Sequence, residues 1–340
     1  MESSIRNILF ELALPGTTLK ALDLLEYIKI DDAKVFLVFR VQDDAIAIAK
    51  TWEEAVLKNC QKVCDLEILI VFNKHIESAT KNNSGIQGVK HVIAIASGKG
   101  GVGKSSVCLN LALAMQKQGL RVGILDTDIY GPSLPTMVGV FEKPSTTDSK
   151  KLIPHQKFGL KLMSMGFIAP KDAAIVWRGL MVQSAVGQML NDVIWDEGAP
   201  LDVLLVDMPP GTGDVQLTIS QKANLTGAII VVTSQELALA DARRAIKMFE
   251  KLNVPIFGVI ENMSSFLCPN CKTTTHIFPY NGVLDECEKQ NMMLLGSIPI
   301  DIAFSESGDI GEPFLERYPN HPISKIFNQI AKTITSQLYA

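Results

Sequence analysis

Cysteine is scarce in this chain: its 340 residues include only 6. That number is too small for the disulfide framework of a small secreted protein. Proline and glycine are also sparse, at 16 and 24 residues, which excludes a collagen-like or low-complexity chain. Positive charge is not in excess, because 32 Lys and Arg residues stand against 36 Asp and Glu residues, a formal net charge of −4. We therefore expect no nucleic acid and no membrane as a partner.

Long hydrophobic runs are missing as well. The longest, such as residues 203–206, have the length of a strand and fall far short of the ~20 residues of a membrane-spanning helix. Residues 1–16 include Glu2 and Glu11 and lack the pattern of a secretory signal or a transit peptide. We therefore expect a cytoplasmic protein, and in that reducing compartment paired cysteines bind metal more often than they bridge each other.

Apolar residues make up 47% of the chain, and its length fits about two domains. In residues 1–79 the pattern predicts a small α/β domain. Its expected elements are helices over residues 19–28 and 51–63 and strands over residues 35–41 and 66–72. The polar stretch that follows predicts a linker over residues 80–88.

From residue 89 to residue 340 the pattern changes to short, continuous apolar runs separated by helical segments. Such runs are typical of parallel strands that are covered on both faces. The alternation predicts an α/β domain with a doubly wound, mostly parallel sheet. The expected strands lie at 92–96, 122–125, 203–206, 228–232, 256–260 and 294–298, and helices are expected at 109–117 and 240–252.

The first of these strands runs directly into a glycine-rich loop. Residues 98–105 fit the pattern G-x-x-x-x-G-K-[ST] of the phosphate loop, in which backbone amides surround a phosphate at the start of a helix. We expect Lys104 to bind the β and γ phosphates and the Ser105 hydroxyl to ligate Mg²⁺. The motif therefore predicts a P-loop NTPase domain with ATP bound by Gly98, Lys99, Gly100, Gly101, Val102, Gly103, Lys104, Ser105 and Ser106.

Lys99 is a second lysine within the loop, and it gives the sequence the deviant form KGGxGK[ST]. In that class, the early lysine resembles a cation donated across a dimer interface to the nucleotide of the partner. A lysine so placed could stabilise the charge that develops on the transferred phosphoryl group. We therefore expect Lys99 to be catalytic and the protein to be a homodimer.

Aspartates follow two of the predicted strands, and ligands of open α/β sheets bind beyond the carboxyl ends of strands. Asp207 is placed to orient the Mg²⁺ shell. Asp128 is expected to orient the attacking water. Asp126 is expected to support the metal shell, although a carboxylate there could instead cap the next helix.

Cys268 and Cys271 form a C-x-x-C pair, and two thiolates do not complete a four-ligand metal site. A two-fold dimer could pool two pairs around one [4Fe–4S] cluster. Alternatively, His276 and Cys287 could complete a Cys₃His zinc site within one chain. Unliganded thiols or a redox couple are the third possibility. Because the phosphate loop implies a dimer, pooling is favoured.

The segments SGKGGVGKSS, GILDTDIYGPSLP, VDMPPGTGDVQLTISQ, ALADARRAIKMFEKLNVPIFGVIENMSSFLCPNC and LLGSIPID, in this order, resemble the Mrp/ApbC-type P-loop ATPases. These are iron–sulfur cluster carrier and scaffold proteins of the deviant-Walker group. The resemblance implies ATP binding at residues 100–106, facing subunits and contact of Asn262 with the adenine. We expect ATP hydrolysis to be slow, because the sequence shows no obvious dedicated base beyond Asp128. It also implies a labile [4Fe–4S] cluster bridged by Cys268 and Cys271 of two chains, and its transfer to apoproteins.

Two other functions remain open. A ParA/MinD-like nucleotide switch would need a surface to bind, and the apolar positions between 323 and 338 superficially suit an amphipathic anchor. With Lys325 and Lys332 as its only cations, that segment is expected to pack on the core instead. A P-loop ATPase stabilised by zinc is the other alternative.

Overall fold

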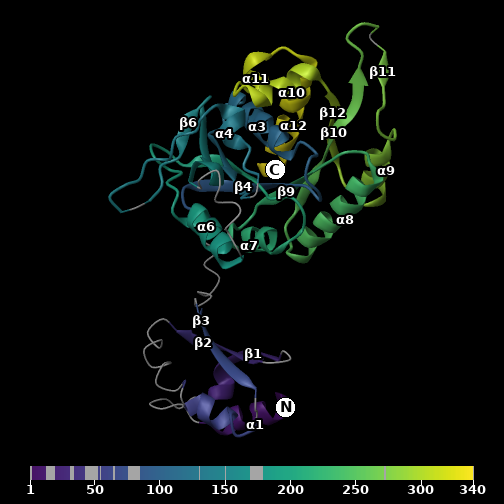
Figure 1. The fold of residues 1–340 in the computed structure, drawn as a ribbon. Coiled ribbons are helices and arrows are strands. Elements are labelled where there is room, and N and C mark those ends of the chain that lie inside the picture. The colour runs from purple at the N-terminus through teal and green to yellow at the C-terminus, as the bar shows by residue number, and fades with distance from the viewer. Residues whose placement is uncertain are drawn as a thin grey trace. The chain divides into compact units, whose positions relative to one another are not determined.

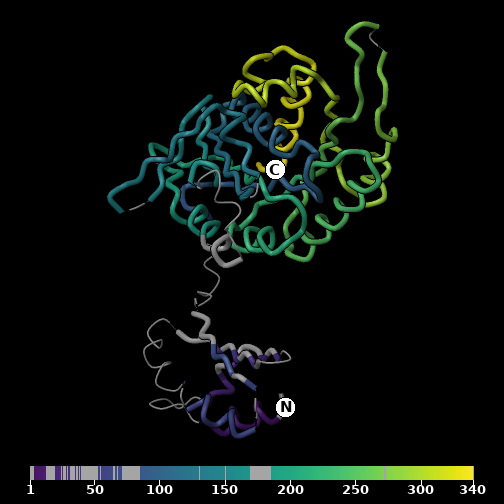
Figure 2. The backbone as a smooth tube through the Cα atoms, viewed as in Figure 1, coloured from purple at the N-terminus to yellow at the C-terminus, as the bar shows by residue number. Residues whose placement is uncertain are grey.

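The computed structural model describes residues 2–12, 20–30, 34–42, 53, 55–63, 66–75, 85–129, 131–149, 151–168, 179–271 and 273–339. The chain divides into two compact units, Met1–Asn83 and Ser84–Ala340, which are drawn as a ribbon in Figure 1 and as a tube in Figure 2. Of the expected linker, residues 80–84 lie outside the described residues. Residues 85–88 lead into the first strand of the second unit.

The first unit builds a three-stranded sheet in the order β1-β2-β3, with β1 antiparallel and β3 parallel to β2. Every second residue of β2 is buried at Val35, Leu37 and Phe39, so one face of the sheet carries the core. Its elements are α1 (Glu2–Glu11), η1 (Ala21–Leu24), β1 (Leu25–Ile30), β2 (Lys34–Gln42), a helical segment that includes residues 55–60, and β3 (Glu67–His75).

The helix expected over residues 19–28 is wrong. A single 3-10 turn, η1, passes directly into the strand β1, which pairs with β2 from Leu25↔Phe39 to Ile30↔Val35. The cross-strand pairing overrides the local helical spacing of the leucines. The helix α1 was not expected, and it covers the sheet with Ile5 and Leu9. The strands expected over residues 35–41 and 66–72 are confirmed as β2 and β3.

In the described part of the second unit, nine strands form one sheet with the path β11-β10-β9-β4-β8-β5-β7-β6, and β12 pairs with β10. All pairings are parallel except β10 with β11 and β6 with β7. The doubly wound, mostly parallel sheet is therefore confirmed. The strands are β4 (Val89–Ala96), β5 (Val122–Asp126), β6 (His155–Lys157), β7 (Leu160–Ser164), β8 (Leu201–Asp207), β9 (Gly227–Val232), β10 (Ile256–Leu267), β11 (Thr274–Thr275) and β12 (Leu294–Ile300).

All six strands expected in this unit are present, and β5, β8 and β9 are buried at every residue. Both faces are covered, with α3, α4, α10, α11 and α12 on one side of the sheet and α6, α7 and α8 on the other (Figure 1). The helices are α3 (Lys104–Lys117), α4 (Leu134–Val138), α5 (Met165–Ile168), α6 (Gly179–Asn191), α7 (Asp214–Lys222), α8 (Glu236–Lys251), α9 (Gly282–Lys289), α10 (Ile302–Asp309), α11 (Phe314–Arg317) and α12 (Pro322–Leu338).

The C-terminal apolar stripe lies on α12, and it packs on the core as expected. Ile323, Phe327, Ile330 and Ile334 are buried in the main hydrophobic cluster, where α12 contacts α3 and β12. The apolar face that a membrane anchor would need is therefore already covered. Within the described part of the chain, no helix combines the length and apolarity that spanning a bilayer requires.

Candidate functional site

The phosphate loop lies between the central strand β4 and the helix α3. Gly101 and Gly103 have φ angles of 80° and 77°, a left-handed conformation that glycine adopts without strain. Gly103 is also the N-cap of α3, and a Cβ atom there would lie 2.2 Å from Asn262 Nδ2. The loop therefore needs glycine at this position for both its backbone and its packing.

The Lys104 ammonium is buried at the start of α3 and forms an ion pair with the Asp207 carboxylate at the end of β8. The same ammonium lies 3.4 Å from Ser105 Oγ. Burial alone would lower the pKa of Lys104, but Asp207 and, more weakly, Asp126 outweigh it and raise that pKa. The lysine therefore stays charged. In this structure its ammonium contacts a carboxylate, and not the phosphates that it is expected to bind.

Asp126 lies opposite Asp207 in the pairing of β5 with β8 and is fully buried. Burial and the Asp207 charge raise the pKa of Asp126 to about 7. Its carboxylate accepts hydrogen bonds from Ser164 Oγ at 2.9 Å, from Asp128 N at 3.1 Å and from Leu134 N at 3.3 Å. Because Leu134 begins α4, Asp126 also binds the first turn of the next helix, as the capping alternative requires.

The oxygens around Lys104 have the chemistry of a magnesium site. Ser105 Oγ and Asp207 Oδ1 converge on one cation, which here is the Lys104 ammonium, and hydroxyl and carboxylate oxygens are the donors that Mg²⁺ prefers. With the lysine drawn to phosphates, Ser105 and Asp207 would hold Mg²⁺, and Asp126 would support them. The ion would neutralise charge on the phosphate oxygens.

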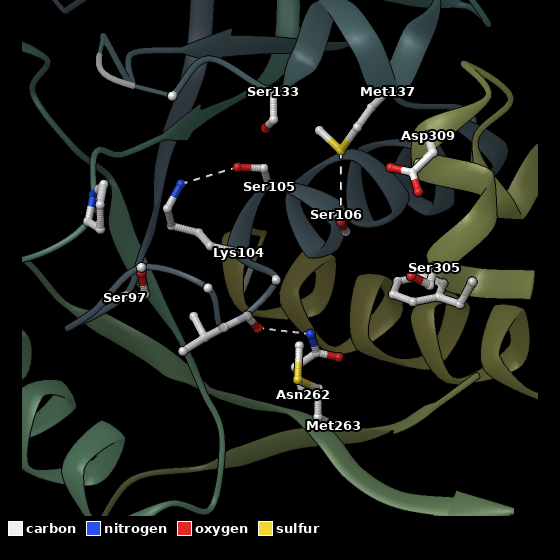
Figure 3. A pocket seen from close by; sticks show the side chains of 18 of the residues that line it. Ser97, Lys104, Ser105, Ser106, Ser133, Met137, Asn262, Met263, Ser305 and Asp309 are labelled. Carbon is white, nitrogen blue, oxygen red and sulfur yellow. Dashed lines mark hydrogen bonds between the residues drawn. The ribbon is translucent and has the colours of Figure 1, made fainter. Parts of the chain in front are cut away.

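A cavity of about 640 Å³ opens over the loop. Lys99, Asp128 and Pro210 line it together with residues 100–106. Figure 3 shows Met137, Ser305 and Asp309 on its far wall, and Asn262 below the loop. The contribution of α10 to this wall was missed, because the segment LLGSIPID before it carried no chemical motif. The cavity has a volume suited to a nucleotide.

Asp128 lies at the boundary of two hollows. It lines the main cavity and a second one of about 420 Å³, which Pro210, Asp214 and Gln216 also border. Its Oδ1 accepts a hydrogen bond from Gly131 N at 3.1 Å. Asp128 therefore borders both the phosphate loop and the segment that follows β8.

Two other expected residues make contacts within the chain. Asn262 is buried, and its Nδ2 donates to Val102 O at 2.9 Å, so it supports the phosphate loop directly (Figure 3). Lys99 Nζ donates to Gln235 Oε1 at 3.0 Å, at the N-cap of α8. The interaction with Gln235 was not foreseen from the sequence, because 136 residues separate the two.

Cys268 and Cys271 lie in the turn of the hairpin that β10 and β11 form, which projects from the sheet in Figure 1. Cys268 N donates to Thr273 O at 3.0 Å, and Cys271 is exposed. Hydrogen bonds with Thr273 and Cys268 lower the pKa of the Cys271 thiol to about 7. The hairpin thus presents the Cys271 thiol to solvent, with the half-buried Cys268 beside it.

The structure does not assemble the Cys₃His alternative. His276 bonds to Ser264 O, and Cys287 is buried in α9. Across the described residues, no three His, Cys, Asp or Glu side chains gather as a metal site. Among the residues that the structure describes, the hairpin therefore presents two thiols with no third His, Cys, Asp or Glu ligand gathered beside them.

A phosphate loop between the central strand and a helix, with strand-end aspartates beside its lysine, defines a P-loop NTPase. The chain belongs to the NUBPL iron-transfer P-loop NTPase family, whose profile matches residues 88–335. The resemblance inferred from the sequence is therefore confirmed.

Two relatives illustrate the similarity. The chain is 43% identical over 295 residues to an iron-sulfur cluster carrier protein of Haemophilus influenzae, covering 86% of this chain and 79% of the relative. It is 47% identical over 254 residues to the "Iron-sulfur protein required for NADH dehydrogenase, mitochondrial" of Arabidopsis thaliana, covering 74% and 80%.

Solved structures agree on the fold. A nucleotide-binding protein of Archaeoglobus fulgidus in complex with ADP is 36% identical with a TM-score of 0.61, covering 71% of this chain and 93% of that one. The cell division ATPase MinD of Pyrococcus furiosus shares the fold at 21% identity and a TM-score of 0.56, covering 73% and 99%.

Proposed function

We propose that this protein is an ATP-hydrolysing iron–sulfur cluster carrier. It binds a labile [4Fe–4S] cluster between the two subunits of a homodimer and transfers it to apo iron–sulfur proteins. The name of its relative in Haemophilus influenzae, an iron-sulfur cluster carrier protein, supports the cluster as cargo. The phosphate loop supports ATP as the nucleotide.

The cysteine hairpin is the observation that carries this proposal. A cubane cluster takes four thiolates, and this hairpin offers Cys268 and Cys271 alone. Two copies of this exposed hairpin would supply the four thiolates. The exposure of Cys271 also suits a cluster that is transferred to another protein.

Within each nucleotide site, the residues divide the work. Lys104 holds the β and γ phosphates, Ser105 and Asp207 hold Mg²⁺ with support from Asp126, and Asp128 orients the attacking water. Lys99 reaches the nucleotide of the partner subunit, and Asn262 lies beside the base. We expect slow hydrolysis, with Asp128 as the residue that orients the water.

The two parts of the chain have different roles in this proposal. Residues 89–340 form the ATPase domain with the cysteine site, and residues 1–79 form an accessory α/β domain. We place the protein in the cytoplasm, where the reducing environment keeps Cys268 and Cys271 free for iron.

The test is metal analysis of the full chain after anaerobic reconstitution with iron and sulfide. We expect about two irons per chain, absorption near ~400 nm and a dimeric mass. Cys268→Ala should abolish iron binding and leave ATP binding unchanged, whereas the buried Cys287→Ala serves as the matched control and should retain iron.

Other outcomes point elsewhere. One zinc per monomer without colour would contradict the shared cluster, as would iron retained by Cys268→Ala. The absence of any bound metal would contradict the role as a cluster carrier and favour a nucleotide switch.

A further inference from the structure

Lys99 is held in its own chain by Gln235. Its ammonium donates to Gln235 Oε1 at 3.0 Å, and Lys99 also lines the nucleotide cavity. Gln235 is the N-cap residue of α8, with an extended backbone at φ −68° and ψ 133°. The cation therefore lies between the phosphate loop and the start of a helix on the other face of the sheet.

The backbone at the Lys99 end is fixed. Ser97 Oγ donates to Lys99 O at 3.0 Å, and Gly211 N donates to Ser97 O at 3.2 Å. Gly98 packs against the backbone of α8 so closely that a Cβ atom there would lie 2.1 Å from the Asp241 carbonyl carbon. The loop and the helix are in direct backbone contact, which sets the reach of the Lys99 side chain.

The Gln235 end is anchored to the sheet by its neighbour. Ser234 Oγ donates to Glu261 Oε1 at 3.1 Å, and Ser297 Oγ donates to Glu261 Oε2 at 2.6 Å. Glu261 lies on β10 and is buried. Ser234 is therefore tied through Glu261 to two strands, which holds the backbone next to Gln235 in place.

The choice of partner for Lys99 is chemically specific. The carboxylates nearest to Gln235 in the sequence are Glu236 and Asp241. They pair with Arg243 and Arg244, respectively, each at 2.8 Å. Among the described residues, Lys99 contacts an amide oxygen, which orients an ammonium without neutralising its charge. A carboxylate would compete with phosphate for the same cation.

We propose that Gln235 is the positioning residue for Lys99, holding its ammonium at the mouth of the nucleotide cavity with its full charge available for a nucleotide phosphate of the partner subunit. The proposal rests on the proposed function, in which Lys99 acts across the dimer. Gln235 is therefore expected to affect the rate of ATP hydrolysis only by positioning Lys99.

The experiment is a double-mutant cycle of steady-state ATP hydrolysis in the full chain, with Lys99→Ala, Gln235→Leu and the double variant. Gln235→Leu should lower kcat roughly tenfold, because the cation loses its orientation, and should change KM for ATP less than twofold. The double variant should be no slower than Lys99→Ala. Glu236→Gln, which removes the neighbouring exposed carboxylate, should match the wild type.

Gln235→Glu is the second variant, and it keeps the shape of the side chain. It should also lower kcat, because the new carboxylate binds the Lys99 ammonium; wild-type turnover by this variant would overturn the proposal. Thermal unfolding of each variant checks that it is folded.

The cycle distinguishes a failure of the proposed function from a failure of the role assigned to Gln235. If Lys99→Ala hydrolyses ATP at the wild-type rate, the catalytic role of Lys99 in the proposed function is wrong, and the inference falls with it. If Lys99→Ala is impaired but Gln235→Leu is not, or if the two defects multiply in the double variant, only the role of Gln235 is wrong.

Discussion

The Lys104 ammonium and the Asp207 carboxylate form a buried ion pair at the carboxyl end of β8, and Ser105 Oγ lies 3.4 Å from the same ammonium. The residue that would bind phosphate therefore contacts, in this structure, the two side chains that would hold Mg²⁺. On nucleotide binding, the Lys104 ammonium must therefore leave the Asp207 carboxylate for the phosphates.

Lys104→Ala removes the cation and leaves Asp207 and Asp126 buried without their counter-ion. We expect the free energy of unfolding to fall by about 3–5 kcal/mol, the cost typical of breaking a buried pair. ATP affinity should fall by about 100-fold or more. Urea unfolding and equilibrium binding of a fluorescent ATP analogue measure the two effects. Lys117→Ala at the other end of α3, where the pair with Glu316 is partly exposed, is the control and should change stability by about 1 kcal/mol or less.

Asp128→Asn separates binding from hydrolysis. If Asp128 orients the attacking water, the variant should bind ATP as the wild type does and hydrolyse it about 100-fold more slowly. Asp148→Asn, in an exposed segment away from the cavity, is the matched control. Equal losses of binding and hydrolysis in Asp128→Asn would instead indicate that the residue shapes the cavity.

Much of this site could be predicted from the sequence because its signals are local. The phosphate loop, the strand-end aspartates and the apolar runs each occupy a few consecutive residues, and buried parallel strands need no alternation. The partners of these residues could not be predicted. Nothing in the sequence joins Lys99 to Gln235, or Asn262 to Val102, since those contacts depend on how α8 and β10 pack.

The errors have the same origin. Residues 25–30 become a strand because β2 supplies a partner, although the apolar positions between Leu19 and Ile28 are spaced as in a helix. The strand β7 was missed, yet it pairs with β5 and carries Ser164, which donates to Asp126. In both β1 and β7, pairing with another strand determines the secondary structure.

Gly98→Ala tests the contact between the phosphate loop and α8. The added Cβ atom would meet the Asp241 backbone at 2.1 Å, and two backbones cannot separate without shifting the loop or the helix. We expect a loss of about 2–3 kcal/mol in the free energy of unfolding, the range of an overpacked core. Gly100→Ala is the control, because its Cβ atom would meet nothing closer than Pro210 at 3.9 Å. Similar unfolding midpoints for the two variants would contradict this packing argument.

Asp202 predicts a dependence of stability on pH. Hydrogen bonds from Arg121 and Lys90, both partly exposed, hold the pKa of Asp202 well below its usual range. Because the pKa is lower in the folded state than the ~3.9 of an unfolded chain, the stabilisation is present above about pH 4 and is lost as the pH falls further.

Asp202→Asn should therefore cost about 1–2 kcal/mol at pH 7, a value reduced by the exposure of both cations. The difference from the wild type should shrink below about pH 4. Urea titrations across that range measure it, with the exposed Glu312→Gln as a control of nearly unchanged stability. A constant difference at every pH would mean that the Asp202 charge is not the cause.

The thiols of this chain should differ sharply in reactivity at pH 7. The pKa of Cys271, lowered to about 7 by Thr273 and Cys268, leaves about half of an exposed thiol as thiolate. Burial raises the pKa of Cys287 to about 11 and that of Cys108 well above its ordinary value. Iodoacetamide should therefore alkylate Cys271 at least ~100-fold faster than either, as mass spectrometry of timed digests would record. Thr273→Val removes the hydroxyl beside the sulfur and should slow Cys271 at pH 7 while leaving its rate at pH 10 unchanged; a slower rate at both values would mean that access, and not the thiolate fraction, limits the reaction.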